Sequence, residues 1–242
     1  MNTHLEKSET QSLSTWKTEK ICGWGRYPKV QALSTHSENM DAFKASFQEL
    51  IHERNHGLVY AHGRSYGDSC LPAQEGRALH SRQLNRILNF DAESGWVHCE
   101  TGVSIYELIQ KFLPLGFFPP VVPGTQFVTV GGALCNDIHG KNHHHDGTFA
   151  DHVRKVEILT ASGELIYCDA DHHSELFWAT VGGLGLTGLI LSMELKLTPV
   201  SGPGIKMESI KVKNLDHFFE LSSESSHFTH TVSWIDCVAK GS

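Results

Sequence analysis

Glycine is concentrated in three short loops, each of which adjoins an apolar strand or helix. The loops are His62–Asp68, Pro123–Gly132 and Gly182–Gly188. Because glycine has no Cβ atom, backbone N–H groups in such loops can approach an anion closely, and Arg64 and Thr129 can add further donors. The loops therefore predict a site for a phosphate-bearing cofactor, although such loops can also serve only to turn the chain. None matches GxxxxGK[ST] or a strand-linked GxGxxG, which argues against nucleoside triphosphate and nicotinamide fingerprints.

The composition indicates a soluble globular protein without a nucleic-acid partner. The 242 residues suffice for one large domain or two small ones, and 40% hydrophobic with 19% charged residues is ordinary for such folds. The net charge of −7 and the scattered Lys and Arg residues offer no basic stripe for nucleic acid. Six cysteines without a CxxC pair predict reduced thiols. With no apolar signal-peptide core and no apolar run long enough for an integral membrane segment, the predicted location is cytoplasmic.

Hydrophobic periodicity in the first half of the chain predicts helices and short strands. Apolar residues at helical spacing predict a helix over Asp41–His56, and an apolar strand is expected over Leu58–Ala61. Ser104 and Glu107 have the spacing of a capping box, which predicts the start of a second helix. This second helix is expected to end at Gly116.

The second half of the chain adds a hairpin, a helix and a long strand. Val153–Leu159 and Leu165–Cys168 flank a turn, and His173–Thr180 is expected to be helical. Leu189–Leu197 alternates, so its odd-numbered apolar residues are expected on one face and Ser192 on the other. Helices and hairpin-linked strands are thus interleaved, which predicts an α+β fold rather than a regular Rossmann winding.

Both ends of the chain differ in character from its middle. Residues 1–20 are rich in Ser, Thr, Glu and Lys and are expected to form a disordered tail. Residues 21–198 are expected to form the main domain, and residues 199–242 the beginning of a second, incomplete α+β domain. The run Thr231–Cys237 resembles a strand, and a strand needs neighbours. Either its partner lies upstream or the natural chain continues, and we favour continuation.

A dense group of histidines and acidic residues occupies residues 136–146. Imidazole and carboxylate are common metal ligands, but adjacent histidines on an extended backbone cannot all face one ion, and no HExxH is present. We therefore expect no native metal site. The group instead indicates a buried polar site at the edge of a cofactor, with His139 and Lys141 as donors and His143–His145 partly in a solvated loop.

Six segments together resemble FAD-linked oxidases of the vanillyl-alcohol-oxidase type, and within them the branch that oxidises polyprenyl-phosphate sugars. In chain order, the segments are Gly23–Arg26, Gly63–Asp68, Pro123–Thr125, Thr129–Gly132, Asp137–His144 and Glu175–Gly183. The resemblance extends from about Ile21 to Lys240. It implies a PCMH-type FAD-binding domain of two α+β subdomains over residues 21–198, followed by the start of a substrate domain.

The same resemblance implies the residues of the FAD site. His139 and Lys141 would lie nearest the substrate, and Tyr66 would help to position its ring. The residues implied to contact FAD are Val59, Tyr60, Ala61, His62, Gly63, Arg64, Ser65, Tyr66, Gly67, Asp68 and Ser69 around the pyrophosphate, then Gly124, Thr129, Val130, Gly131 and Gly132, then His139, Gly140, Lys141 and Asn142, and finally Ile190.

Chemistry of this class transfers a hydride from a carbinol carbon to the flavin. The implied substrate is a primary or secondary alcohol of a sugar, an alditol or a lipid-linked polyprenyl-phosphate sugar, and the implied partner is a short-chain reductase that acts next. Relatives with covalently bound flavin have a histidine before the serine of the first loop. Arg64 occupies that position, so FAD is expected to be bound non-covalently. A truncated module that binds FAD without turnover is the alternative.

Overall fold

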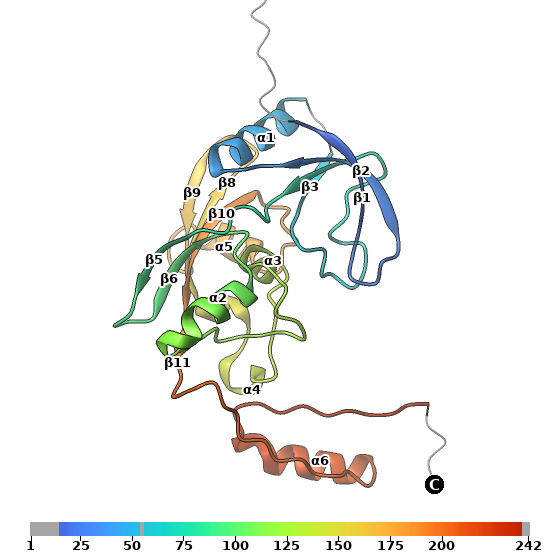
Figure 1. Cartoon of the computed structure of the whole chain (residues 1–242), viewed down its shortest axis with the longest axis vertical. Helices are drawn as coiled ribbons and strands as arrows, with labels where there is room; N and C mark the ends of the chain where they lie inside the picture. The colour runs from blue at the N-terminus through green and yellow to red at the C-terminus, as the bar shows by residue number, and fades with distance from the viewer. Residues whose placement is uncertain (1–14, 54–55, 239–242) are drawn as a thin grey trace, which may run out of the picture.

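The chain folds into two α+β subdomains, each of which is built around its own sheet (Figure 1). The structure is a computed structural model and describes residues 15–53 and 56–238. It confirms the predicted α+β class and the division into two subdomains. Within the described part of the chain, no helix has the length and apolar character needed to cross a membrane.

The first subdomain contains a four-stranded mixed sheet. Its strands lie in the order β1 (Lys17–Cys22), β2 (Lys29–His36), β4 (Arg77–His80) and β3 (Gly57–Tyr60). β1 and β2 are antiparallel, whereas β2 and β3 both run parallel to β4. Helix α1 (Met40–His52) is capped by Asn39, whose side chain accepts a hydrogen bond from the Ala42 N–H at 2.9 Å. It ends four residues before the predicted boundary at His56.

β1 shows that the predicted tail over residues 1–20 is wrong for its last part. Residues 17–20 pair with β2, in a register that joins Lys17 to Ser34 and Lys20 to Gln31. The strand escaped prediction because it is an edge strand, in which Ile21 is the buried side chain and polar residues face solvent. The rest of that expected tail, residues 1–14, lies outside the described residues.

The second subdomain contains a five-stranded antiparallel sheet. Its strands lie in the order β5 (Ile87–Asp91), β6 (Trp96–Glu100), β10 (Leu189–Lys196), β8 (Val153–Leu159) and β9 (Leu165–Cys168). The predicted hairpin of β8 and β9 is confirmed. Helices α2 (Ile105–Phe112), α3 (Val130–Cys135) and α5 (Ser174–Thr180) bury apolar residues in the main core. Shorter elements are β7 (Phe117–Phe118), β11 (Thr198–Pro199) and the 3-10 helices Leu113–Leu115 and Phe149–His152.

A β-bulge in β10 corrects the predicted alternation of this strand. The register with β8 shifts between Ile190 and Ser192. An extra residue at a bulge reverses which face the following side chains occupy. Leu191 consequently packs in the core of the first subdomain, whereas Met193 joins Ile190 in the core of the second. Because β10 is the central strand, Ser192 is also buried rather than exposed.

The segment after β11 lies apart from both sheets (Figure 1). It contains helix α6 (Leu215–Glu224) and the 3-10 helix Ser225–His227, and none of its residues between 201 and 238 is buried. The run Thr231–Cys237 pairs with no strand of the described chain, so the alternative of an upstream partner is not borne out. A strand is stable only when a neighbouring strand is available to pair with it. Hydrogen bonds that join it to the body run from the Thr231 N–H to the Lys141 carbonyl, at 3.0 Å, and from the rings of His144 and His145 to the carbonyls of Phe228 and Ser226.

Candidate functional site

A cavity of about 570 Å³ is lined by residues from both subdomains, within the range typical of ligand sites. The first subdomain contributes the loop after β3, and the second contributes the segment before α3, α3 itself and the turn before β10. The predicted cofactor residues in its lining are Val59, Ala61, His62, Gly63, Arg64, Ser65, Tyr66, Ser69, Gly124, Thr129, Gly131, Gly132, His139 and Ile190. The three glycine loops identified from sequence therefore meet around one space.

The loop after β3 is held tightly against the preceding strand. Gly63 has φ = +58°, and a Cβ atom at this position would lie 2.3 Å from the Tyr60 Oη and 2.7 Å from the Cys22 carbonyl oxygen. Tyr60 Oη also donates a hydrogen bond to that carbonyl at 2.8 Å. Both the positive φ and the close approach require glycine at position 63. The tyrosine thus anchors the loop from behind and does not line the cavity.

The same loop presents donors that the described protein leaves unused. Among the described residues, no backbone carbonyl accepts a hydrogen bond from the N–H groups of Gly63, Arg64, Tyr66 or Gly67. The Arg64 side chain is exposed and adds a positive charge, while one of its nitrogens donates to the His62 carbonyl at 3.2 Å. A cluster of free N–H groups beside a cation suits a diphosphate.

In contrast to the loop after β3, the N-terminal turn of α3 has N–H groups that are hydrogen-bonded within the protein. The Val130 N–H donates to the Val103 carbonyl at 2.8 Å, and the Gly131 N–H donates to the Thr101 carbonyl at 3.0 Å. The Gly132 N–H donates to the Thr129 Oγ1 at 3.2 Å. These N–H groups are already paired within the protein, so this turn contributes mainly a small, close-packed wall to the cavity.

The three residues predicted to act on substrate occupy different positions. His139 lines the cavity, and its Nδ1 lies 3.4 Å from the Gly140 carbonyl oxygen. Tyr66 also lines the cavity; it is 81% exposed and stands edge-to-face against Trp24, with ring centroids 5.4 Å apart. Lys141 is exposed and is not part of the lining. The structure thus brings His139 and Tyr66 to one cavity and leaves Lys141 outside its lining.

Several other predicted cofactor residues do not line the cavity. Asn142 is buried, and its Nδ2 donates to the Pro120 carbonyl at 2.8 Å and to Asp146 at 2.6 Å. Val130 belongs to the main core. The predicted cofactor residues outside the lining are Tyr60, Gly67, Asp68, Val130, Gly140, Lys141 and Asn142.

The cavity also has lining residues that were not predicted. They are Trp24, Leu58, Cys70, Ser81, Pro123, Thr101, Thr125, Val128, Cys135, Asn136, Asp137, Ile138, Leu184, Gly185 and Gly188. Four of the sequence motifs signalled part of this set. Trp24 lies in Gly23–Arg26, Asp137 and Ile138 lie in Asp137–His144, and the second and third glycine loops contain Pro123, Thr125, Val128, Leu184, Gly185 and Gly188. Thr101 and Ser81 carry no such signal, because tertiary packing alone brings them to the cavity.

Burial shifts the pKa values of His62, Cys70 and Cys135 in the cavity wall. Burial, followed by the charges of Arg82 and Arg64, lowers the pKa of His62, so its ring is neutral near pH 7. Burial raises the pKa of Cys135 to about 11 and also raises the pKa of Cys70. Both thiols are therefore protonated at neutral pH and are poor nucleophiles. All six cysteines are free thiols.

Comparison with known proteins confirms the resemblance seen in the sequence. Residues 38–169 match the model of the FAD binding domain. Over 229 residues, the chain is 38% identical to decaprenylphosphoryl-beta-D-ribose oxidase of Mycolicibacterium smegmatis. The aligned region covers 92% of this chain and 49% of that protein.

Two further relatives are more distant. L-gulonolactone oxidase of Scyliorhinus torazame is 27% identical over 62% of this chain and 34% of that protein. Cytokinin dehydrogenase 3 of Arabidopsis thaliana is 32% identical over 71% of this chain and 33% of that protein. The chain thus spans about half or less of the length of these relatives. A match to the FAD binding domain over more than half of the chain, with the free N–H groups beside Arg64, shows that this protein belongs to the FAD-binding-domain family and that FAD is its cofactor.

Proposed function

We propose that the protein is an FAD-dependent oxidoreductase that oxidises a primary or secondary alcohol of a sugar, an alditol or a polyprenyl-phosphate sugar. The observation that carries the proposal is the cavity between the two subdomains, in which a loop with unused N–H groups faces a wall that ends at His139. The similarity to decaprenylphosphoryl-beta-D-ribose oxidase supports the substrate class.

The loop Val59–Ser69 is proposed to hold the FAD diphosphate. Its free N–H groups and the Arg64 guanidinium compensate the negative charge. The paired turn Thr129–Gly132, together with Gly124 and Ile190, would shape the wall against which the cofactor packs. Asn142 acts from behind this wall, because its hydrogen bond to Pro120 holds the backbone that leads to Gly124.

Bound FAD supplies the acceptor for the hydride that leaves the carbinol carbon. The protein's own task is to orient the alcohol and to take its proton. His139 is proposed for this role through Nε2, because Nδ1 faces the Gly140 carbonyl. Tyr66 is proposed to position the sugar ring from the opposite loop, and Lys141 to bind a substrate oxygen at the edge of the site.

FAD binding without turnover is a second candidate function. It is favoured by residues 201–238, which are all at least partly exposed and form no hydrophobic core of their own. We propose that residues 199–242 begin the substrate domain of the family. A cytoplasmic location and a short-chain reductase as the next enzyme also remain proposals.

The visible spectrum of the purified chain tests the cofactor site. We expect a flavin spectrum, and acid precipitation should release the flavin into the supernatant. The reason is that Arg64 occupies the position at which relatives with covalently bound flavin have a histidine. Arg64→Gln should weaken FAD binding, whereas the matched substitution Arg154→Gln, on an arginine that pairs with Glu194 outside the cavity, should not. A protein that stays colourless after addition of FAD would contradict the proposed site.

Turnover tests the proposed role of His139. Candidate polyols and phospho-ribosides should bleach the flavin by reducing it, and an artificial electron acceptor should then reoxidise it. His139→Gln should lower kcat by about 10²–10⁴-fold with unchanged flavin content, because a positioned base is lost. His145→Gln is the matched control, since His145 bonds to the Ser226 carbonyl and does not line the cavity. Full flavin occupancy without bleaching by any substrate would favour the second candidate function.

A further inference from the structure

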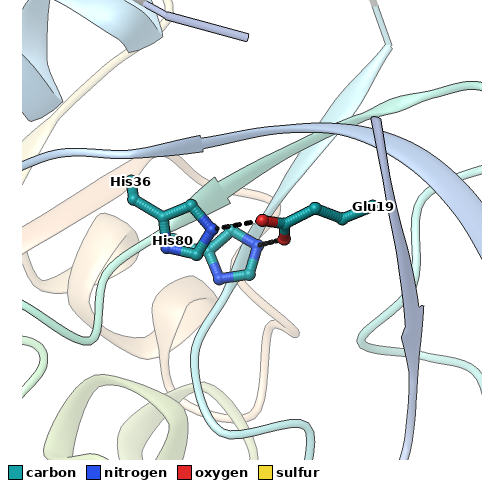
Figure 2. Close-up of side chains that lie close together, drawn as sticks. All are labelled: Glu19, His36 and His80. Atoms are coloured by element: carbon teal, nitrogen blue, oxygen red, sulfur yellow. Dashed lines mark hydrogen bonds and ion pairs between the residues drawn. The ribbon is translucent and has the colours of Figure 1, made fainter. Parts of the chain in front are cut away.

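Three side chains converge on one face of the first sheet, outside the FAD cavity. Glu19 lies on β1, and His36 and His80 are the last residues of β2 and β4 (Figure 2). His36 and His80 are direct partners in the parallel register, so both project from the same face. One ligand atom from each of the three side chains lies within 4.8 Å of the others.

His80 contains a buried polar atom that makes no hydrogen bond to any described residue. Its side chain is 8% exposed, and its Nε2 makes no hydrogen bond in the described structure. The nearest oxygen of Glu19, Oε2, lies 3.6 Å away, which is too far for a hydrogen bond. Buried ring nitrogens are normally satisfied by a partner, and this one points towards Glu19 (Figure 2).

We propose that Glu19, His36 and His80 bind a divalent transition-metal ion of the zinc class. Two imidazoles and one carboxylate form a ligand set that suits such ions, with a further position left for water. An anion is disfavoured because Glu19 supplies a negative charge at the centre of the cluster.

The spacing of the ligand atoms fits this coordination. A tetrahedral ion with bonds of about 2.1 Å holds its ligand atoms about 3.4 Å apart. His36 Nε2 lies 2.9 Å from one oxygen of Glu19, Oε1, and His80 Nε2 lies 3.6 Å from the other oxygen, Oε2, so a small movement of these side chains suffices to place three ligand atoms around one ion. The two rings are stacked with centroids 4.0 Å apart, so His36 must turn to aim its nitrogen at a shared ion. Its side chain is 43% exposed, which leaves it room to turn and gives the ion an entry from solvent.

The surroundings keep His80 in the form that binds metal. Burial, followed by the neighbouring His36, lowers the pKa of His80 to about 4, so its ring is neutral at neutral pH. The fixed element of the site is therefore the buried, neutral His80, and the exposed His36 completes it. Sequence gave no sign of this group, since its members lie 17 and 44 residues apart and the expected absence of a metal site rested on residues 136–146.

Ion binding would join the edge strand β1 to the middle of its sheet. β1 leads through Cys22 to Trp24, which lines the FAD cavity. The role proposed for the ion is structural: it fastens the strand that positions this part of the cavity wall.

Zn²⁺ binding to the whole chain tests the proposal. The background protein carries His143→Asn, His144→Asn and His145→Asn, because that exposed run can bind Zn²⁺ by itself. After dialysis against a chelator, titration with Zn²⁺ should show one ion per chain and a raised Tm, and Co²⁺ should give the visible absorption of a four-coordinate site. Loss of a residue that only hydrogen-bonds to a metal ligand weakens metal binding by about 10–100-fold. His36→Gln removes a proposed ligand itself and should weaken Zn²⁺ binding by more than this.

His80→Asn should abolish the bound ion, with circular dichroism as the check on folding. His36→Gln provides the decisive variant if His80→Asn unfolds, because His36 is exposed and its replacement leaves the core intact. His172→Gln is the matched control, since it changes an exposed histidine that pairs with Asp169 elsewhere. Zn²⁺ affinity that is absent in the background protein, or that is equal in His36→Gln and His172→Gln, would overturn the proposal.

Discussion

At the scale of single residues, the packing around each glycine distinguishes positions that require it from positions that tolerate a side chain. A Cβ atom on Gly131 would lie 2.0 Å from Thr101 Oγ1 and 3.0 Å from the Thr101 carbonyl oxygen. Around Gly124, which also lines the cavity, no heavy atom lies within 4 Å of such a Cβ. Both glycines stood in the same predicted cofactor loop, and only the tertiary contact with Thr101 separates them.

Gly131→Ala should therefore lower the free energy of unfolding by about 1–3 kcal/mol, as overpacking does in cores. Gly124→Ala should change it by less than about 0.5 kcal/mol. Urea unfolding followed by circular dichroism measures both. Equal stabilities of the two variants would show that α3 can move away from Thr101 without cost.

Glu107 gives the start of α2 a dependence on pH. Burial alone would raise the pKa of Glu107, but the hydrogen bonds from Ser104 and Asn85 outweigh it and hold the pKa below its usual value of 4.5. The unfolded chain therefore takes up the proton first as the pH falls. The stabilisation is complete above about pH 4.5 and is lost as the pH falls through the folded-state pKa.

Glu107→Gln should remove this part of the acid dependence. Its free energy of unfolding should be lower than that of the parent protein at pH 7, and the difference should shrink below pH 4.5. Glu164→Gln, which removes the same charge from the exposed turn between β8 and β9, is the control. A constant difference between parent and Glu107→Gln from pH 7 to pH 3 would refute the argument.

At the scale of elements, the local signals in the sequence located α2 well and β10 poorly. The capping box at Ser104 forms as expected, with the Ser104 N–H 2.7 Å from the Glu107 carboxylate. This motif is complete within four residues, so sequence contains all of it. The bulge in β10 depends on the pairing with β8, a separate segment, and alternation within β10 does not reveal it.

The bulge makes Leu191 part of the contact between the subdomains. Leu191 is fully buried and packs in a cluster with Leu79 and Leu84 of the first subdomain. Leu191→Ala should lower the free energy of unfolding by about 2–5 kcal/mol, because it leaves a cavity at this contact. Leu186→Ala, at a residue that is 74% exposed, should cost less than about 0.5 kcal/mol. Similar values for the two variants in chemical unfolding would mean that the contact contributes little.

At the scale of the whole molecule, the stable body consists of the two sheets and the helices packed on them. Residues 201–238 include no buried side chain, although His144 and His145 of the short helix α4 (His143–Asp146) bond to the carbonyls of Phe228 and Ser226. These bonds are exposed and contribute little to stability.

A chain that ends at Val200 should consequently keep the far-UV circular dichroism of its two sheets and lose less than about 1 kcal/mol of stability. A chain that begins after β1, at Gly23, is the comparison. It should be clearly less stable, because β1 covers the edge of the first sheet. If the shorter C-terminus destabilised the body more than the loss of β1, residues 201–238 would have to belong to the folded core.

Sequence by itself determined the α+β class, the FAD-binding family and the loops that surround the cavity. These properties depend on short motifs, in which glycine, capping and apolar residues act on neighbours a few positions away. Only the tertiary structure decided which N–H groups are free, since those of Val130 and Gly131 are taken by carbonyls of a distant segment. It also decided that Glu19, His36 and His80 meet on one face of a sheet. Such meetings depend on strand order and register, which join residues that no local pattern connects.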